Sequence, residues 1–499
     1  MTPDLLLAPG LLPFLVGGVL LGIIVGAVPG LTATLAISLL LPLTFGLETL
    51  PAIVMMTGIF TGGIYGGSIA AITLRIPGAP ASAMTMLDGH AMAQQGRAGS
   101  AIALATFSSF VGGIFGGVVL VLFAPQLARI ALTFQSPEMF ALVLLALVAV
   151  ATVSPESLLK SMTATVIGLM LATVGIDRLV PVPRYTFGSV DLLVGVPLIP
   201  VVIGLFAVTE LLHQSEQSDQ SDQSSRSGES ARRAEAAPEI GFPRLAALWS
   251  DVRSVGIGVW VKSPVIGTLV GALPGAGAAM AAFLSYSEAK RSSAEPERFG
   301  SGVPEGIVAP EAANNAMTGG AFIPMLALGI PGDAVTAVIL GGLVVHGITP
   351  GPQLFGGSSE LLGPLFGAYF WSYVLILVFG LALIPVFVRI TRIPRGVLFP
   401  LIGSLALTAA FTSEGTTFAM YLTAGVGVLG FVLRRYGYPL IPVLLGLILG
   451  PMLESNLRRS LILSQGDLTV FLRSPIAAAL LLGAAAFPLW MLRRRSGVS

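Results

Sequence analysis

The sequence contains no cysteine, which excludes disulfides, thiolate metal sites and cysteine nucleophiles. Charged residues make up only 10% of the 499 residues, whereas soluble proteins carry about a quarter. Hydrophobic residues make up 54%, and the mean hydropathy is +0.90. So little polar surface excludes a water-soluble globule, and the net charge of +1 gives no sign of a nucleic-acid partner. The composition predicts an all-α polytopic membrane protein, whose helices tolerate the 61 glycines and 35 prolines.

Sequence signatures of enzymes are missing as well. None of the three lysines, Lys160, Lys262 and Lys290, follows a glycine, so the chain has no P-loop. The HExxH and GxSxG motifs are also missing. The three histidines lie far apart in the chain, and we interpret them as interface or loop residues. We therefore expect no enzyme and no cofactor. Without an ATPase motif, any transport by this chain would take its energy from an ion gradient of Na⁺ or H⁺ or from a partner.

Apolar segments of spanning or near-spanning length form two sets on either side of a polar stretch. The first set is 11–28, 29–45, 51–74, 100–123, 137–153, 160–176 and 191–212, and the second is 255–273, 274–287, 318–345, 364–388, 397–412, 416–433, 437–453 and 474–492. Segments 274–287 and 437–453 fall short of the roughly 20 residues that cross a bilayer. We expect them to be half-helices, re-entrant hairpins or pieces of broken helices.

These sets define four parts of the chain: an N-terminal membrane repeat (1–213), a linker (214–243), a C-terminal membrane repeat (244–460) and an extra C-terminal helix with a tail (461–499). The linker is rich in Ser, Gln, Asp and Glu and has almost no large apolar residues, so we expect it to be disordered. Residues 1–10 carry no Lys or Arg, unlike a cleaved signal peptide. We expect the first apolar segment to be retained as a span.

Four short motifs occur in both halves, in the same order and at offsets of 242 to 257 residues. They are GAVPG at 26–30 with GALPG at 271–275, TGG at 61–63 with TGG at 318–320, IPG at 76–78 with IPG at 330–332, and PLIPV at 197–201 with PLIPV at 439–443. Each motif alone is weak because PG and GG are common here. Their shared order predicts a tandem duplication.

The orientation of the repeats follows from the basic residues, which favour the cytoplasmic side. A cytoplasmic linker puts four basic clusters of the second half inside, and a first half of seven segments then puts the N-terminus outside and the C-terminus inside. Basic residues of the first half support this poorly, because Arg129 and Arg184 fall outside. An odd number of segments per repeat predicts inverted topology with broken helices, a pattern typical of secondary transporters.

The matched Pro-Gly motifs predict breaks that bind substrate. Proline removes a backbone donor and glycine loosens a helix, so each motif can split its helix and expose free N–H groups at a half-helix tip, which attract anions. Small or hydroxylated residues follow each break and allow close approach of a ligand. The candidate substrate residues here are Pro29, Gly30, Thr32, Thr34, Pro274, Gly275 and Gly277. A packing kink between helices is the structural alternative.

Two further blocks supply polar candidates. Around the IPG turns, Ser68 is a substrate candidate, and Asp88 and Asp333 could bind the coupling ion or could cap helices. In the segment PEGIVAPEAANNAMT, Asn314, Asn315 and Thr318 are substrate candidates and Glu311 is an ion-coupling candidate. Neighbouring amides offer donors to a carboxylate and carbonyl oxygens to a cation. Ordinary capping in a loop is the alternative.

These blocks resemble the large membrane subunit of the tripartite tricarboxylate transporter family, the TctA type. The most specific is APEAANNA followed by GG and LGIPG, and the resemblance runs through nearly all of the chain except the linker and ends. It implies a multi-pass permease of the cell inner membrane that imports tricarboxylates or related carboxylates. It also implies a small four-helix membrane subunit (TctB type), an extracytoplasmic solute-binding protein (TctC type) and an elevator-like movement. An intramembrane enzyme and an anion channel are the rival interpretations.

Overall fold

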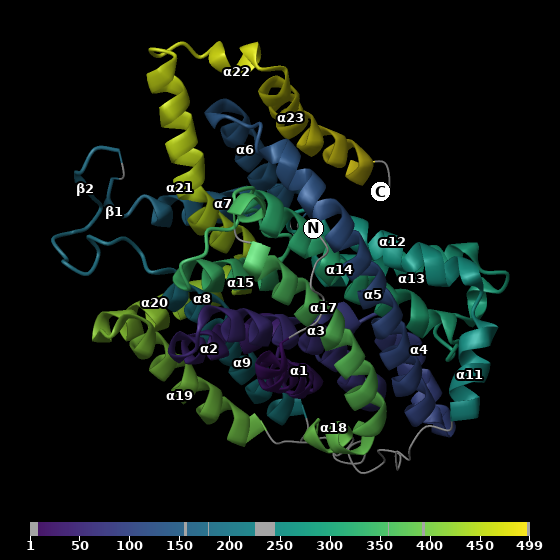
Figure 1. The fold of residues 1–499 in the computed structure, drawn as a ribbon. Coiled ribbons are helices and arrows are strands. Elements are labelled where there is room, and N and C mark those ends of the chain that lie inside the picture. Colours follow the sequence, from purple (N-terminus) through teal and green to yellow (C-terminus); the bar gives the residue numbers. More distant parts are fainter. Residues whose placement is uncertain are drawn as a thin grey trace.

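The computed structural model describes residues 8–153, 157–177, 179–224, 245–357, 359–391 and 395–496, which are almost entirely helical (Figure 1). The helices of the first half are α1 (Leu12–Ala27), α2 (Ala33–Leu40), α3 (Thr49–Leu74), α4 (Thr85–Met92), α5 (Ala98–Ala131), α6 (Ser136–Val153), α7 (Leu158–Ala172), α8 (Leu198–Val202) and α9 (Thr209–Ser224). A two-stranded antiparallel hairpin, β1 (Gly175–Ile176) and β2 (Pro183–Arg184), lies between α7 and α8.

The second half begins at α11 and repeats the long-and-short pattern of helices. Its helices are α11 (Leu245–Ser254), α12 (Ile257–Gly271), α13 (Gly277–Ser292), α14 (Glu305–Leu328), α15 (Ala334–Val345), α16 (Leu354–Gly357), α17 (Ser359–Ala382), α18 (Ile384–Ile390), α19 (Arg395–Glu414), α20 (Thr417–Arg435), α21 (Leu440–Leu463), α22 (Val470–Arg473) and α23 (Pro475–Ser496).

Eight helices of the described chain are long and apolar enough to cross a membrane, or up to nine if the bent pair α11–α12 counts as one span. The two helices of that pair meet at 81°. This confirms the predicted all-α polytopic membrane protein. Its short helices, such as α2 and α13, are the near-spanning segments of the sequence.

Two segments differ from the sequence predictions. The short segment 437–453 is part of α21, which has 24 residues and is long enough to span. Helix α9 continues to Ser224, so the first residues of the predicted disordered linker are helical. At the start of the linker, Gln214 donates to Glu210 one turn earlier and to the Gly30 carbonyl of the first break. Residues 225–244, the rest of the linker, lie outside the described residues.

Glycines allow α1 to pack closely along α3. A Cβ atom added at Gly18 would lie 2.4 Å from the Met55 carbonyl oxygen, and one added at Gly26 would lie 2.4 Å from that of Gly63. Residues later in α1 contact residues later in α3, so the two helices run parallel. Backbones this close require small residues at the contact, as in other transmembrane helix pairs.

The pair α12 and α14 repeats this packing in the second half. A Cβ atom added at Gly267 would lie 2.0 Å from the Ala313 carbonyl oxygen, and one added at Gly271 would lie 2.2 Å from that of Met317. These helices are therefore also parallel. Helix α14 lies in turn along α5, where Gly112 faces Ala312.

The two IPG turns make the same contact in the two halves. A Cβ atom at Gly78 would lie 2.3 Å from the carbonyl oxygen of Gly26, and one at Gly332 would lie 2.4 Å from that of Gly271. Gly26 with Gly271, and Gly78 with Gly332, are residues that the sequence motifs match. The turns therefore return to the last turn of α1 and of α12 in the same manner.

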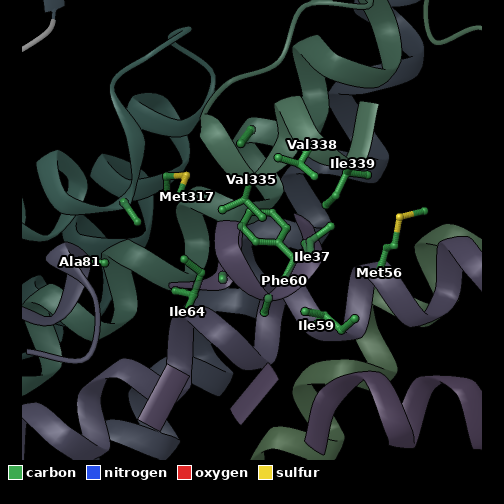
Figure 2. Packing of buried hydrophobic residues seen from close by; sticks show 14 of the residues in the cluster. Ile37, Met56, Ile59, Phe60, Ile64, Ala81, Met317, Val335, Val338 and Ile339 are labelled. Atoms are coloured by element: carbon green, nitrogen blue, oxygen red, sulfur yellow. The ribbon is translucent and has the colours of Figure 1, made fainter. Parts of the chain in front are cut away.

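Elements of one half pack against elements of the other around an apolar core. Helix α2 contacts α15, and α13 contacts η3, the short 3-10 turn Pro80–Ser82 that follows the first IPG turn. Figure 2 shows Phe60 of α3 among Ile37 of α2 and Val335 and Val338 of α15. Around this core, α6 and α7 pack with α21 and α23 as a second group of helices (Figure 1).

Candidate transport site

Both Pro-Gly motifs interrupt their helices as predicted. Helix α1 ends at Ala27 and α2 begins at Ala33, while α12 ends at Gly271 and α13 begins at Gly277. Gly30 and Gly275 have φ angles of +86° and +84°. L-residues with a side chain rarely adopt this conformation, so glycine is needed at both breaks. Gly277 has a φ of +67° and lies at the tip of α13.

The tips of the two half-helices are capped differently. Thr32 accepts a hydrogen bond from Leu35 N (3.2 Å) and caps α2, whereas α13 has no side-chain cap at Ala276. The breaks also have different neighbours: the Gly30 carbonyl accepts from Gln214 of α9 (2.7 Å), and Gly275 N donates to the Gly332 carbonyl (2.8 Å). Among the hydrogen bonds of the described residues, none joins 28–32 to 272–276.

The middle of α14 carries a fully buried polar cluster made of Glu311, Asn314 and Asn315. Thr85 of α4 donates to Glu311 Oε1 at 2.5 Å, and Ser109 of α5 donates to Oε2 at 3.1 Å. The Asn315 amide donates to Ser109 Oγ (2.9 Å), to Asn314 Oδ1 (2.5 Å) and to the Glu311 carbonyl (3.0 Å). Residues distant in sequence thus meet at one point between three helices.

This cluster is incompletely satisfied. Asn314 Nδ2, a donor, and Asn315 Oδ1, an acceptor, are buried and form no hydrogen bond within the described part of the molecule. Among those residues, no salt bridge reaches the Glu311 carboxylate either. Burying such groups without partners is costly. An acidic group, a free donor and a free acceptor are together suited to hold a proton or cation next to a polar ligand.

Thr318 lies one turn further along α14 and bonds to two tyrosines. Its hydroxyl is 2.7 Å from the Tyr369 hydroxyl and 2.8 Å from that of Tyr373, and Tyr373 also donates to the Asn315 carbonyl (3.0 Å). The sequence analysis missed both tyrosines, as well as Thr85 and Ser109. The four-residue spacing of the tyrosines on one face of an apolar helix was the available signal.

The two aspartates have helix-end and loop roles in this structure. Asp88 is buried, and it accepts from the backbone N–H groups of Gly300, Gly302 and Val303 and from the Tyr286 hydroxyl. Asp333 caps α15 by accepting from Thr336 N (2.8 Å). Asp333 therefore caps a helix, whereas Asp88 lies inside α4 and holds the loop 300–303. Ser68 donates to the Tyr65 carbonyl within α3 (2.7 Å), and Ser38 donates to the Thr34 carbonyl within α2 (2.6 Å).

A cavity of about 470 Å³ lies between the hairpin, α7, α15 and α21. Four charged side chains on its wall join the two halves: Asp177 and Arg184 of the hairpin region with Glu454 and Arg458 of α21. Backbone N–H groups of Val180 and Leu179, together with Arg458, hold the pKa of Asp177 well below its ordinary value. Gly329, the residue before the second IPG motif, lines the same cavity.

Comparison with known proteins assigns the chain to a family. The family model described as "Tripartite tricarboxylate transporter TctA family" matches residues 12–445. The chain belongs to this family. It is therefore a multi-pass membrane component of tricarboxylate transport, as the resemblance implied.

Two relatives come from Agrobacterium vitis. One is an uncharacterized 52.8 kDa protein in the TAR-I ttuC' 3' region, 38% identical over 93% of this chain and 89% of its own length. The other is an uncharacterized protein in the TAR-II ttuC' 3' region, 42% identical over 43% of this chain and 89% of its own length. No solved structure matches the chain.

Proposed function

We propose that this TctA-family chain is the permease subunit of an uptake system for tricarboxylates or related organic carboxylates. In this proposal it lies in the inner membrane, a TctC-type binding protein delivers the substrate, and a TctB-type subunit completes the membrane part. An ion gradient drives alternating access. The observation that carries the proposal is the buried cluster Glu311, Asn314 and Asn315, with a free donor and a free acceptor at the middle of α14.

We assign different roles to the members of this cluster. The Asn314 amide and the uncapped tip of α13 supply donors for a substrate carboxylate, and the space beside Gly277 at that tip is open. Glu311, which has hydroxyl donors but no basic partner in the described chain, holds the coupling ion, a proton or Na⁺. Binding a cation there neutralises the buried Glu311 carboxylate. Occupancy by the ion therefore changes the free energy of the cluster that binds the substrate.

Inverted repeats are part of the same proposal. The end of α3 lies beside the start of α14, because α4 contacts both: its His90 meets the Ile72 carbonyl of α3, and its Asp88 holds the loop 300–303 that precedes α14. Helices α3 and α14 therefore run in opposite directions, each parallel to its own partner. This supports two modules that enter the membrane from opposite sides, with the N-terminus outside and the linker and C-terminus cytoplasmic.

Uptake by proteoliposomes tests the function. The complete system, with binding protein and small subunit, is supplied with labelled citrate and an inward gradient of Na⁺ or of H⁺. We expect accumulation above the external concentration, which an anion channel without a coupling ion does not give. Absence of accumulation under either gradient, with the substrate chemically unchanged, contradicts the proposal, and chemical conversion of citrate favours an intramembrane enzyme.

Single substitutions in the same assay test the site. Hydrogen bonds to charged groups contribute about 1.5–3 kcal/mol, so Asn314→Ala and Asn315→Ala should each raise KM by about tenfold or more. Ser404→Ala, on α19 and bonded only to its own helix through the Leu401 carbonyl, is the control. Normal uptake by both asparagine variants, at normal expression, removes them from the site.

A further inference from the structure

His346 ends α15 and holds this helix to the other half of the chain. Its Nδ1 atom lies 2.8 Å from the Gly342 carbonyl oxygen, one turn earlier in α15. Its Nε2 atom lies 3.1 Å from the carbonyl oxygen of Thr44, in the 3-10 segment η2 (Leu41–Gly46) that follows α2. The ring thus joins the elements that follow the first break and the second IPG turn.

Both partners of this ring are acceptors. A carbonyl oxygen cannot donate, and a neutral imidazole has only one N–H, so one of its nitrogens would face an oxygen lone pair with its own lone pair. The imidazolium donates from both nitrogens and satisfies both contacts. His346 is also the C-cap of α15, where the helix dipole favours a positive charge.

The charged groups on the elements next to His346 are mostly acidic. Acidic groups lie on the neighbouring elements: Glu48 precedes α3, Glu360 lines a cavity of about 620 Å³ together with Gly347 and Ile348, and Glu414 ends α19, which packs against η2. Glu454 and Arg458 of α21 line the larger cavity together with Val344. Arg458 is paired with Asp177 and Glu454, and no salt bridge of the described residues includes His346.

We propose that His346 is a proton-binding site that links the two halves on the face of the molecule where these cavities open. Binding of H⁺ completes both hydrogen bonds and holds the end of α15 to η2, and loss of the proton breaks one bond and frees these elements to separate. The ligand is the proton itself, reached through the cavity beside Gly347. The link to uptake rests on the proposed transport function, whereas proton binding does not.

Nitrogen NMR of the ring tests proton binding directly. The chain has three histidines, so a variant carrying His213→Asn leaves two histidine rings to observe, those of His346 and His90. His90 is the internal reference, because its Nδ1 meets one carbonyl, that of Ile72 (3.0 Å), which a neutral ring satisfies. We expect the full-length protein to show a larger imidazolium fraction at His346 than at His90 across pH 6–8. An equal or smaller fraction at His346 overturns the proposal.

Uptake in the complete system tests the consequence. We expect His346→Asn to flatten the dependence of the uptake rate on external pH, His346→Lys to keep uptake but to remove that dependence, and His90→Asn to keep the wild-type profile. A wild-type pH profile in both His346 variants overturns the role in uptake. If the wild type does not accumulate citrate while NMR shows the imidazolium, the proposed function fails and the proton site stands.

Discussion

Helices α3 and α14 have equivalent places in the two halves, yet their buried side chains differ. The matched glycines Gly26 and Gly271 face the carbonyls of Gly63 and Met317, so Glu311, Asn314 and Asn315 correspond to Thr57, Phe60 and Thr61. The Thr57 hydroxyl donates to the Ile53 carbonyl of its own helix (2.9 Å), and Phe60 is buried in the apolar core. The duplicated scaffold is shared, whereas the acid and the amides occur only in α14.

This difference separates two requirements. Close packing of α1 on α3 and of α12 on α14 needs glycine at similar places, and both halves keep it. Ligand chemistry needs polar atoms with free valences, and in the matched pair α3 and α14 those atoms, Asn314 Nδ2 and Asn315 Oδ1, lie on α14. A duplicated membrane protein can thus keep a symmetric frame while one copy carries the polar site.

The largest expected effect comes from removing the charge that only α14 has. Glu311→Gln should abolish gradient-driven accumulation, because a neutral amide cannot bind a proton and lacks the negative charge that balances a buried Na⁺. The matched change in α3, Thr57→Ala, should retain ion-dependent accumulation and lower only thermal stability, by about 1 kcal/mol. Uptake by proteoliposomes under both gradients measures this. Ion-driven accumulation by Glu311→Gln at the wild-type level contradicts the assignment.

The shared frame is tested by adding one methyl group to each half. Gly26→Ala and Gly271→Ala put a Cβ within 2.4 Å and 2.2 Å of a facing carbonyl oxygen. Each should destabilise the protein by about 1–3 kcal/mol, seen as a Tm lower by several degrees. Gly17→Ala in α1 and Gly258→Ala in α12 are the controls, since their Cβ atoms would meet nothing within 4 Å. A Tm drop for only one of the two pairs indicates that the frame is not shared.

The sequence was sufficient to predict the helical membrane fold and both breaks. Pro29-Gly30 and Pro274-Gly275 act locally, through a missing N–H and a positive φ, so their effect can be read without the rest of the chain. Glycines at matching positions, such as Gly26 and Gly271, also helped to reveal the duplication, because close helix packing selects small residues.

The polar cluster was only half predictable. Glu311, Asn314 and Asn315 stand together in the sequence, but Thr85, Ser109 and Tyr373 come from three other helices. Nothing local marks Thr85 and Ser109, because their contacts depend on how α4 and α5 pack against α14, and for Tyr373 the only signal was its four-residue spacing from Tyr369. The β1–β2 hairpin was missed because its strands have two residues each and show no alternating pattern: β1 falls at the end of the predicted segment 160–176, and β2 falls between that segment and 191–212.

A smaller effect is expected from the side chain that holds only the first break. Gln214 donates to the Gly30 carbonyl, whereas the second break is held by a backbone bond between Gly275 and Gly332. Gln214→Ala should cost about 1–2 kcal/mol, since the part-buried hydrogen bonds of this side chain to the Gly30 carbonyl and to Glu210 are lost. Thermal unfolding in detergent measures it, with Gln465→Ala in the loop after α21 as the control. An unchanged Tm for Gln214→Ala shows that the first break stands without this side chain.

The smallest expected effect concerns the ionic contact that ties the halves together at the hairpin. Asp177 has its pKa held below the ordinary value of about 4. Its charge therefore stabilises the folded state above about pH 4, and this contribution is lost as the pH falls further toward the folded-state pKa. The Tm of wild type should exceed that of Asp177→Asn at pH 7, and the gap should narrow below pH 4. The exposed Asp191, which has no salt bridge within the described chain, is the control, and Asp191→Asn should show no such gap. A gap that persists unchanged at low pH assigns the stabilisation to packing of the hairpin rather than to the Asp177 carboxylate.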